Sequence, residues 1–153
     1  MFPWKTILAP TDFSAASNAS VALAATIART NGARLIVLNV VELHGGLSRD
    51  TLIHAPGASV PTTAGDFARE DAERHLAAQL ETLGGGLEPE PEIVFGNAAE
   101  SIVGAATRHN ADVIVMGTHG RRGLVRALLG SVAERVVRTA TVPVLTLPSP
   151  DAT

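Results

Sequence analysis

Three glycines and a serine recur at fixed spacing in the last third of the chain. Gly117 and Gly120 are separated by two residues, and after nine more residues Gly130 precedes Ser131. Glycine lets the backbone approach a ligand closely and take positive φ, while the first amides of a helix point outward without intrahelical partners. Those amides and the helix dipole favour phosphate. The spacing therefore predicts a phosphate-binding turn in which the hydroxyl and the amide of Ser131 can both reach an anion.

The flanking residues supply the strand and the helix that such a turn needs. Residues 113–116 form an apolar, β-branched run typical of a strand buried on both faces. After the turn, Val132, Val136 and Val137 recur at helical spacing. Each glycine taken alone also fits a tight turn, and Ser131 also fits an ordinary N-cap. The joint pattern, between a buried strand and a helix, favours the phosphate site.

The complete pattern, Met116-Gly117-Thr-His-Gly120, nine residues and then Gly130-Ser131, resembles the G-x2-G-x9-G-[S/T] motif of ATP-binding members of the universal stress protein family. The resemblance extends from Lys5–Asp12 to Val142–Leu145 and so covers nearly the whole chain. It implies a stress-response or regulatory protein that binds ATP and acts as a homodimer.

The resemblance also implies where the nucleotide lies. Pro10, Thr11 and Asp12 would line the adenine and ribose end, and Val40 would give the base an apolar wall and a backbone hydrogen bond. The ribose and phosphates would meet the glycine turn and the helix after it, namely Met116, Gly117, Thr118, His119, Gly120, Arg121, Arg122, Gly123, Gly130, Ser131, Val132 and Ala133. Within that set, the two arginines suit phosphate because guanidinium forks match phosphate oxygens.

Two of these residues have a second interpretation. Asp12 precedes an expected helix and also fits a turn or capping carboxylate, and it is a candidate to hold Mg through water beside the ATP phosphates. His119 either contacts a phosphate or faces solvent. The other histidines have no ligand-like spacing. The sequence therefore predicts no catalytic residue and no metal site made of protein groups alone.

Apolar runs alternate with helical patterns along the chain. The expected strands are residues 6–10, 35–41, 93–95, 113–116 and 141–147, and the expected helices are residues 14–30, 67–83 and 97–109 with a fourth after Gly130. This alternation predicts an α/β fold, a Rossmann-like, doubly wound parallel sheet in the order 3-2-1-4-5 with helices on both faces. Ligands bind such sheets where the winding reverses, here between the first and fourth strands.

Prolines and glycines predict loops and sheet edges. They interrupt residues 43–64, which we expect to form a flexible loop, either a flap near the ligand or an inert segment. Pro91 and Pro143 place the third and fifth strands at edges. The last strand, Thr141–Leu147, is apolar, so a second copy is expected to cover it in a symmetric homodimer.

Composition limits the class of protein. A length of 153 residues predicts a single domain over 1–153, with a short disordered tail at about 149–153. A net charge of −3 gives no general attraction to nucleic acid or to an anionic membrane. No apolar run approaches a bilayer span and the first residues do not resemble a signal peptide. With no cysteine in the chain, disulfides are excluded and a cytoplasmic location is expected.

Two other functions are consistent with the same residues. Slow ATP hydrolysis would need a positioned water and a base, but Asp12 would lie at the ribose end and the direction of Glu134 is open. The chain can also be an interaction module without a physiological nucleotide. The sequence leaves open ATP against AMP or a cyclic nucleotide, the stress or pathway, and the protein partners.

Overall fold

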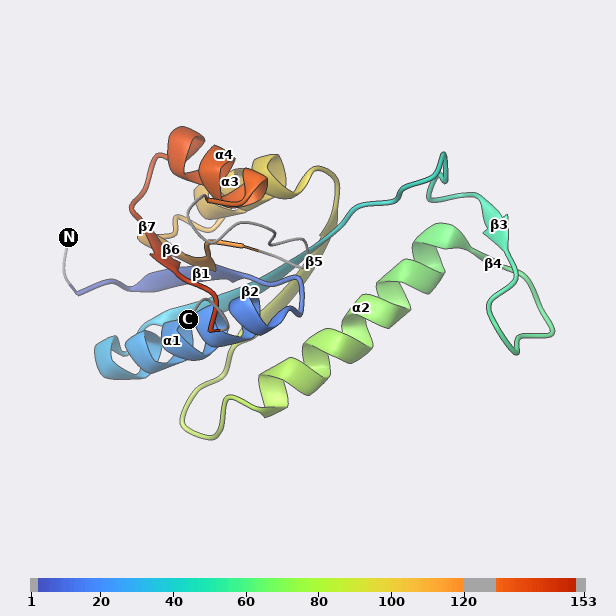
Figure 1. Cartoon of the computed structure of the whole chain (residues 1–153). Coiled ribbons are helices and arrows are strands. Elements are labelled where there is room, and N and C mark those ends of the chain that lie inside the picture. The colour runs from blue at the N-terminus through green and yellow to red at the C-terminus, as the bar shows by residue number, and fades with distance from the viewer. Residues whose placement is uncertain (1–2, 120–128, 151–153) are drawn as a thin grey trace.

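A five-stranded parallel sheet forms the centre of the molecule (Figure 1). The computed structural model describes residues 3–119 and 129–150. The sheet consists of β1 (Thr6–Pro10), β2 (Arg34–Val41), β5 (Glu90–Phe95), β6 (Val113–Gly117) and β7 (Val144–Leu147). Its spatial order is β5-β2-β1-β6-β7, with every neighbouring pair parallel. Counted along the chain, this is the predicted order 3-2-1-4-5, which is confirmed.

Helices cover both faces of the sheet. They are α1 (Ala15–Asn31), α2 (Ala64–Glu81), α3 (Ala98–Arg108) and α4 (Ser131–Thr139). Successive strand side chains point to opposite faces, so Ile7 of β1 joins α1 and α2 in one core layer while Leu8 joins α3 and α4 in the other. Both side chains are fully buried. The two layers explain why the central strands are apolar without alternation. None of the described helices is long and apolar enough to cross a membrane.

Capping side chains decide where three of the helices begin. The side chain of Ser14 accepts from the Ser17 amide, that of Thr63 from the Asp66 amide, and that of Asn97 from the Glu100 amide. The predicted start of α2 was wrong, because the helix begins three residues before residue 67. Thr63 supplies its cap at a position where the apolar periodicity has not yet begun.

The segment predicted to be an irregular loop contains a small hairpin. Residues Leu52–Ile53 (β3) pair antiparallel with Thr62–Thr63 (β4), and Figure 1 shows the hairpin standing away from the sheet beside the start of α2. The sequence analysis missed these strands, while motion of the segment stays a prediction. The prediction that Pro143 lies within the last strand was wrong, because β7 begins at the next residue. Pro91, predicted to precede the third strand, lies within β5, because this strand begins at Glu90, three residues before the predicted start; β5 is an edge strand as predicted.

Candidate functional site

The carboxyl ends of β1 and β6 lie side by side at the point where the winding of the sheet reverses. The strands pair in parallel, with Ile7 opposite Val113. A Cβ added to Gly117 would lie 3.1 Å from the Cβ of Ala16 and 3.3 Å from its carbonyl oxygen. The end of β6 therefore packs directly against the first turn of α1. The turn after Pro10 and the turn after Met116, far apart in the sequence, meet at one edge of the sheet.

The Asp12 side chain helps to build the turn between β1 and α1. Its Oδ1 accepts hydrogen bonds from the Ser14 amide at 3.0 Å and from the Ser17 hydroxyl at 2.9 Å. Phe13 between them has a φ of 65°, which is uncommon for a bulky side chain and marks a sharp change of direction. The geometry supports the turn interpretation of Asp12. Ligand contact by the same carboxylate stays a prediction.

Thr11 is buried, and its backbone and hydroxyl groups are hydrogen-bonded within the protein. Its amide donates to the Leu38 carbonyl at 2.8 Å, and its hydroxyl oxygen accepts from the Phe13 amide at 3.1 Å. Asn39, a buried residue in β2, donates through Nδ2 to the Thr11 carbonyl at 2.9 Å. The sequence analysis did not assign Asn39 a role, although a lone amide in an apolar strand was the available signal. Asn39 fixes the position of the turn that carries Asp12.

The apolar residues of the predicted site contribute mainly through the backbone. Pro10 is buried, and the Met116 side chain is 6% exposed in the core layer beneath α3 and α4. Val40 is half-buried and packs against the same layer. A ligand at this edge would therefore meet the peptide groups of these residues and part of the Val40 side chain.

The amino terminus of α4 differs from those of the other helices. Gly130 occupies the N-cap position, and no side chain of a described residue caps the helix. The Gly130 amide donates to the Thr118 carbonyl at 2.7 Å, and an added Cβ would lie 2.9 Å from that oxygen. Ser131 is the first helical residue, so the alternative in which Ser131 is the N-cap was wrong. Its side chain is exposed, as is Val132, whereas Ala133 is buried.

Between β6 and α4, the described residues are held by local contacts. The Thr118 amide donates to the Leu147 carbonyl at 2.8 Å, which links the turn to β7. The Thr118 hydroxyl and Nδ1 of His119 lie 3.0 Å apart. Thr118 thus lies at the junction of β6, β7 and α4. The remaining predicted residues, Gly120, Arg121, Arg122 and Gly123, lie outside the described part of the chain.

A cavity of about 420 Å³ opens at the carboxyl ends of β2 and β5. Val41, the neighbour of Val40, lines it, together with Phe95 and Asn97. The cavity therefore adjoins the predicted adenine end but does not coincide with the junction of β1 and β6. The sequence analysis did not predict it, because its walls come from residues scattered over β2, the following segment and β5.

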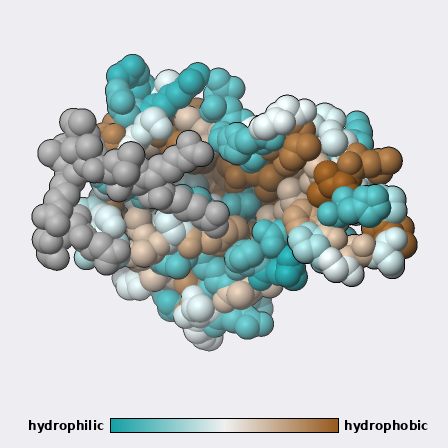
Figure 2. All heavy atoms as spheres, turned by 45° about the vertical axis from the view of Figure 1, so that its right-hand side comes forward, coloured by the Kyte–Doolittle hydropathy of each residue, from teal (hydrophilic) through white to brown (hydrophobic). Residues whose placement is uncertain are grey.

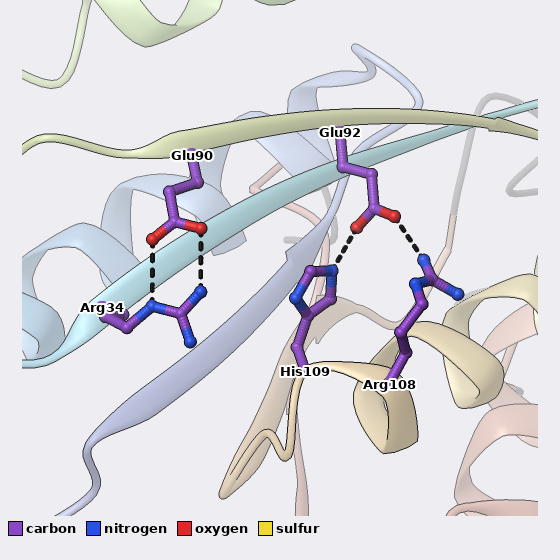
Figure 3. A network of polar contacts seen from close by, with 5 residues as sticks. All are labelled: Arg34, Glu90, Glu92, Arg108 and His109. Atoms are coloured by element: carbon purple, nitrogen blue, oxygen red, sulfur yellow. Dashed lines mark hydrogen bonds and ion pairs between the residues drawn. The ribbon is translucent and has the colours of Figure 1, made fainter.

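A group of ion pairs lies beside the first residues of β2 and β5 (Figure 3), whereas the candidate site lies at the carboxyl ends of the strands. Glu92 accepts from Nη2 of Arg108 and lies 2.6 Å from Nε2 of His109, while Arg34 pairs with Glu90 at 2.9 Å. Burial by itself raises the pKa of Glu92, but the hydrogen bonds from His109 and Arg108 outweigh it, so the pKa lies below its ordinary value. These groups fasten the end of α3 to β5 and lie away from the candidate site.

The family model described as the universal stress protein family matches residues 3–148. The chain belongs to the universal stress protein family. Universal stress protein MJ0531 of Methanocaldococcus jannaschii is 32% identical over 148 residues, which make up 96% of this chain and 84% of that protein. Universal stress protein MJ0577 of the same organism is 29% identical over 153 residues, covering 93% of each.

Solved structures of similar proteins share the fold. The structure of MJ0577 has a TM-score of 0.71 at 25% identity and covers 94% of this universal stress protein and 95% of its own chain. A universal stress protein crystallised in complex with cAMP has a TM-score of 0.69 at 22% identity, covering 95% and 98%. One from Archaeoglobus fulgidus in complex with dAMP has a TM-score of 0.58 at 24% identity, covering 95% and 98%.

Proposed function

We propose that this universal stress protein binds ATP at the junction of β1, β6 and α4 and acts as a regulatory protein in a stress response. The observation that carries the proposal is the start of α4. Within residues 3–119 and 129–150, each of the other three helices has a capping side chain, whereas α4 begins at Gly130 without one. The helix start is joined to the turn after β6 by the hydrogen bond from the Gly130 amide to the Thr118 carbonyl, at the carboxyl ends of the strands where α/β proteins bind ligands. The first amides of a helix attract phosphate.

The two close glycine contacts support the same location. A side chain at Gly117 would press on Ala16, and one at Gly130 would press on the Thr118 carbonyl. Both glycines therefore allow backbone segments to converge at the strand ends. The cAMP and dAMP complexes of two proteins with this fold support an adenine nucleotide as the ligand class. ATP is our choice within that class because the complete glycine pattern leads to a helix start that suits phosphate.

Magnesium would arrive with the phosphates. Among the described residues no group of three or more metal-binding side chains comes together. Magnesium nevertheless often uses only one or two carboxylates besides substrate phosphates and water, and Asp12 is the carboxylate at this edge. Glu134, which the sequence left open as a base for hydrolysis, pairs instead with Arg138 one turn along α4. We therefore propose a binding function without a catalytic step.

Calorimetric titration of ATP, AMP and cAMP into the wild-type protein and two alanine variants tests the site. Gly130→Ala places a methyl against a backbone oxygen and should weaken ATP binding at least tenfold. Gly104→Ala is the matched control, because its added Cβ would meet no atom within 4 Å. Unchanged ATP affinity in a folded Gly130→Ala variant would refute the proposed phosphate site, and absence of binding by all three nucleotides would refute the proposed function.

We propose further that the protein forms a homodimer through β7. This strand is one edge of the sheet, and Leu145 on it is 36% exposed. Val137 of α4 is also exposed, at 47%. Apolar edge strands are commonly covered, and two copies of β7 can pair around a two-fold axis.

A further inference from the structure

Two arginines differ from all others in the described part of the chain. Six arginines donate to a carboxylate or carbonyl oxygen, namely Arg29, Arg34, Arg74, Arg108, Arg135 and Arg138. Arg49 and Arg69 make no hydrogen bond through their guanidinium groups and no ion pair to any described residue. A guanidinium carries five N–H donors in a planar fork that matches phosphate and carboxylate oxygens. These two forks are therefore available for a ligand.

Both guanidinium groups contact the same aromatic ring. Cζ of Arg49 lies 4.4 Å from the centroid of Phe95, and Cζ of Arg69 lies 5.3 Å from it. The two positive charges are consequently within about 10 Å of each other. The ring attracts each cation through its quadrupole and holds the guanidinium near one position while the N–H donors stay unused. Arg49 follows β2, Arg69 lies on α2 and Phe95 ends β5, so three separate elements bring the cluster together.

Two cavities meet at this cluster. Arg49 and Phe95 line the cavity of about 420 Å³, whose apolar walls include Leu43 and Leu47. Arg49 and Arg69 both line a second cavity of about 240 Å³. The larger volume lies within the range of small-molecule sites. Figure 2 shows apolar residues exposed on the part of the molecule that carries the projecting hairpin.

We propose that Arg49 and Arg69 bind the phosphate of a small phosphate monoester, whose apolar or aromatic part lies in the larger cavity against Phe95. A phosphate monoester carries a charge near −2 at neutral pH, which matches two guanidinium groups, and its organic part matches the apolar wall. Arg69 lies on α2, and Ile93, two residues before Phe95 on β5, packs in the core layer of α1 and α2, whereas α4 packs in the opposite layer. The site is therefore separate from the nucleotide site proposed above.

Two carboxylates line the second cavity with the arginines. They belong to Asp50 and Asp66, and neither lies within 4.0 Å of a guanidinium nitrogen of a described arginine. In the larger cavity, Glu42 accepts from the Ala98 amide at 2.6 Å and so is bound to the start of α3. Repulsion from the two aspartates opposes a bound anion. The proposal therefore predicts opposite effects from neutralising the arginines and neutralising an aspartate.

Isothermal titration calorimetry with phenyl phosphate at low salt tests the site. Phenol and inorganic phosphate, which each carry one half of that ligand, are titrated separately. Phenyl phosphate should bind, inorganic phosphate should bind more weakly, and phenol should show no heat. Arg49→Gln and Arg69→Gln should each weaken phenyl phosphate binding about tenfold. Asp50→Asn should strengthen it several-fold, because one repulsive charge is removed. Arg74→Gln is the matched control, since Arg74 lies on α2 and pairs with Asp71.

Three results would overturn the proposal. The first is failure of phenyl phosphate to bind the wild-type protein at millimolar concentration. The second is an Arg49→Gln/Arg69→Gln double variant that is folded by circular dichroism and binds within twofold of wild type. The third is equal loss in Arg74→Gln, which would indicate a general charge effect. This experiment is independent of ATP binding.

Discussion

Gly130 and Gly104 show how the surroundings of a missing side chain decide the effect of adding one. A Cβ at Gly130 would lie 2.9 Å from the Thr118 carbonyl oxygen, closer than real Cβ contacts permit. The φ of Gly130 is −60°, so the backbone conformation itself accepts other residues. Steric contact, and not φ, therefore requires glycine here. Gly104 lies inside α3 with open space around it.

The first prediction concerns the stability of these two variants. Gly130→Ala should lower the free energy of unfolding by about 1–3 kcal/mol, because the Thr118 carbonyl must shift to admit a methyl group. Gly104→Ala should raise it by about 0.5–1 kcal/mol, since alanine is the better helix former. Urea denaturation of both variants beside the wild type measures the difference. Equal shifts of the same sign would contradict the steric explanation.

Asp112 is the subject of a second residue-scale prediction. Its Oδ2 accepts from the Lys5 amide at 2.7 Å and from the Thr6 amide at 2.9 Å, and these hydrogen bonds hold the pKa of Asp112 below its ordinary value of 3.8. A lowered folded pKa stabilises the protein above about pH 4, and that contribution is lost as pH falls through the folded pKa. Asp112→Asn should lower stability at pH 7 by about 0.5–1 kcal/mol, because water screens the carboxylate, and it should reduce the loss of stability as pH falls below about 4.

Thermal unfolding from pH 7 to pH 2 measures both effects. Glu73→Gln is the control, because Glu73 is exposed on α2 and its side chain makes no hydrogen bond to a described residue. If the unfolding temperature of Asp112→Asn fell with decreasing pH as steeply as that of the wild type, Asp112 would be excluded as a source of acid sensitivity.

At the scale of elements, the edge strand β5 depends on contacts beyond its hydrogen bonds to β2. Pro91 lies within it, and a strand with proline is confined to an edge. The Glu92 carboxylate pairs with both Arg108 and His109 at the end of α3 (Figure 3). The side chains of Glu92 and His109 are 22% and 24% exposed, so this contact is partly shielded from water. The carboxylate therefore ties the last turn of α3 to the sheet.

Glu92→Gln tests that tie. The variant should lose about 1–2 kcal/mol of stability at pH 7, because two charge-assisted contacts are weakened in a partly buried position. The pKa of Glu92 is below its ordinary value of 4.5, so the wild-type contribution is present above that pH and is lost as pH falls through the folded pKa. The difference between variant and wild type should accordingly shrink below about pH 4. Urea denaturation at pH 7 and pH 3 measures it.

The neighbouring pair of Arg34 and Glu90 supplies the comparison. Both side chains are about half exposed, so water screens their interaction. Glu90→Gln should change stability at pH 7 much less than Glu92→Gln does. The reverse order would show that shielding does not decide the strength of these ion pairs.

An element was predictable from the sequence when its residue pattern repeated over several residues. The buried strands and α1 were predictable because several residues repeat one pattern. Gly32, with a φ of 62°, caps α1, which ends at Asn31, one residue beyond the predicted end. The β3–β4 hairpin was not predictable, because two-residue strands cannot show a period. Asn39 and the Arg49–Phe95–Arg69 cluster depend on contacts between elements, which no local spacing encodes.

At the scale of the whole molecule, the strand order brings the candidate site together. The first and fourth strands along the chain are neighbours, so the Asp12 turn and the Gly117 turn meet although about a hundred residues separate them. The same order places β7 at one edge and β5 at the other. The β5 edge carries a proline, which discourages further pairing, whereas β7 begins after its proline and presents Leu145. The two edges are thus unequal, and β7 is the better surface for a second copy.

Apolar side chains are also exposed on the hairpin, where Leu52 and Val60 are each 70% exposed. They define a competing interface, so the dimer prediction compares Leu145→Glu with Leu52→Glu. Sedimentation velocity should show a dimer for the wild type and for Leu52→Glu, but a monomer for Leu145→Glu, because a charge facing its own symmetry mate on β7 is repelled and desolvated. A monomer only for Leu52→Glu would assign dimerisation to the hairpin.

The choice between edge and hairpin matters for the ligand sites, because the Thr118 amide donates to the carbonyl of Leu147 on β7. A dimer through β7 would therefore hold the glycine turn of each copy near its partner. A dimer through the hairpin would instead bring the partner near the Arg49–Phe95–Arg69 cluster.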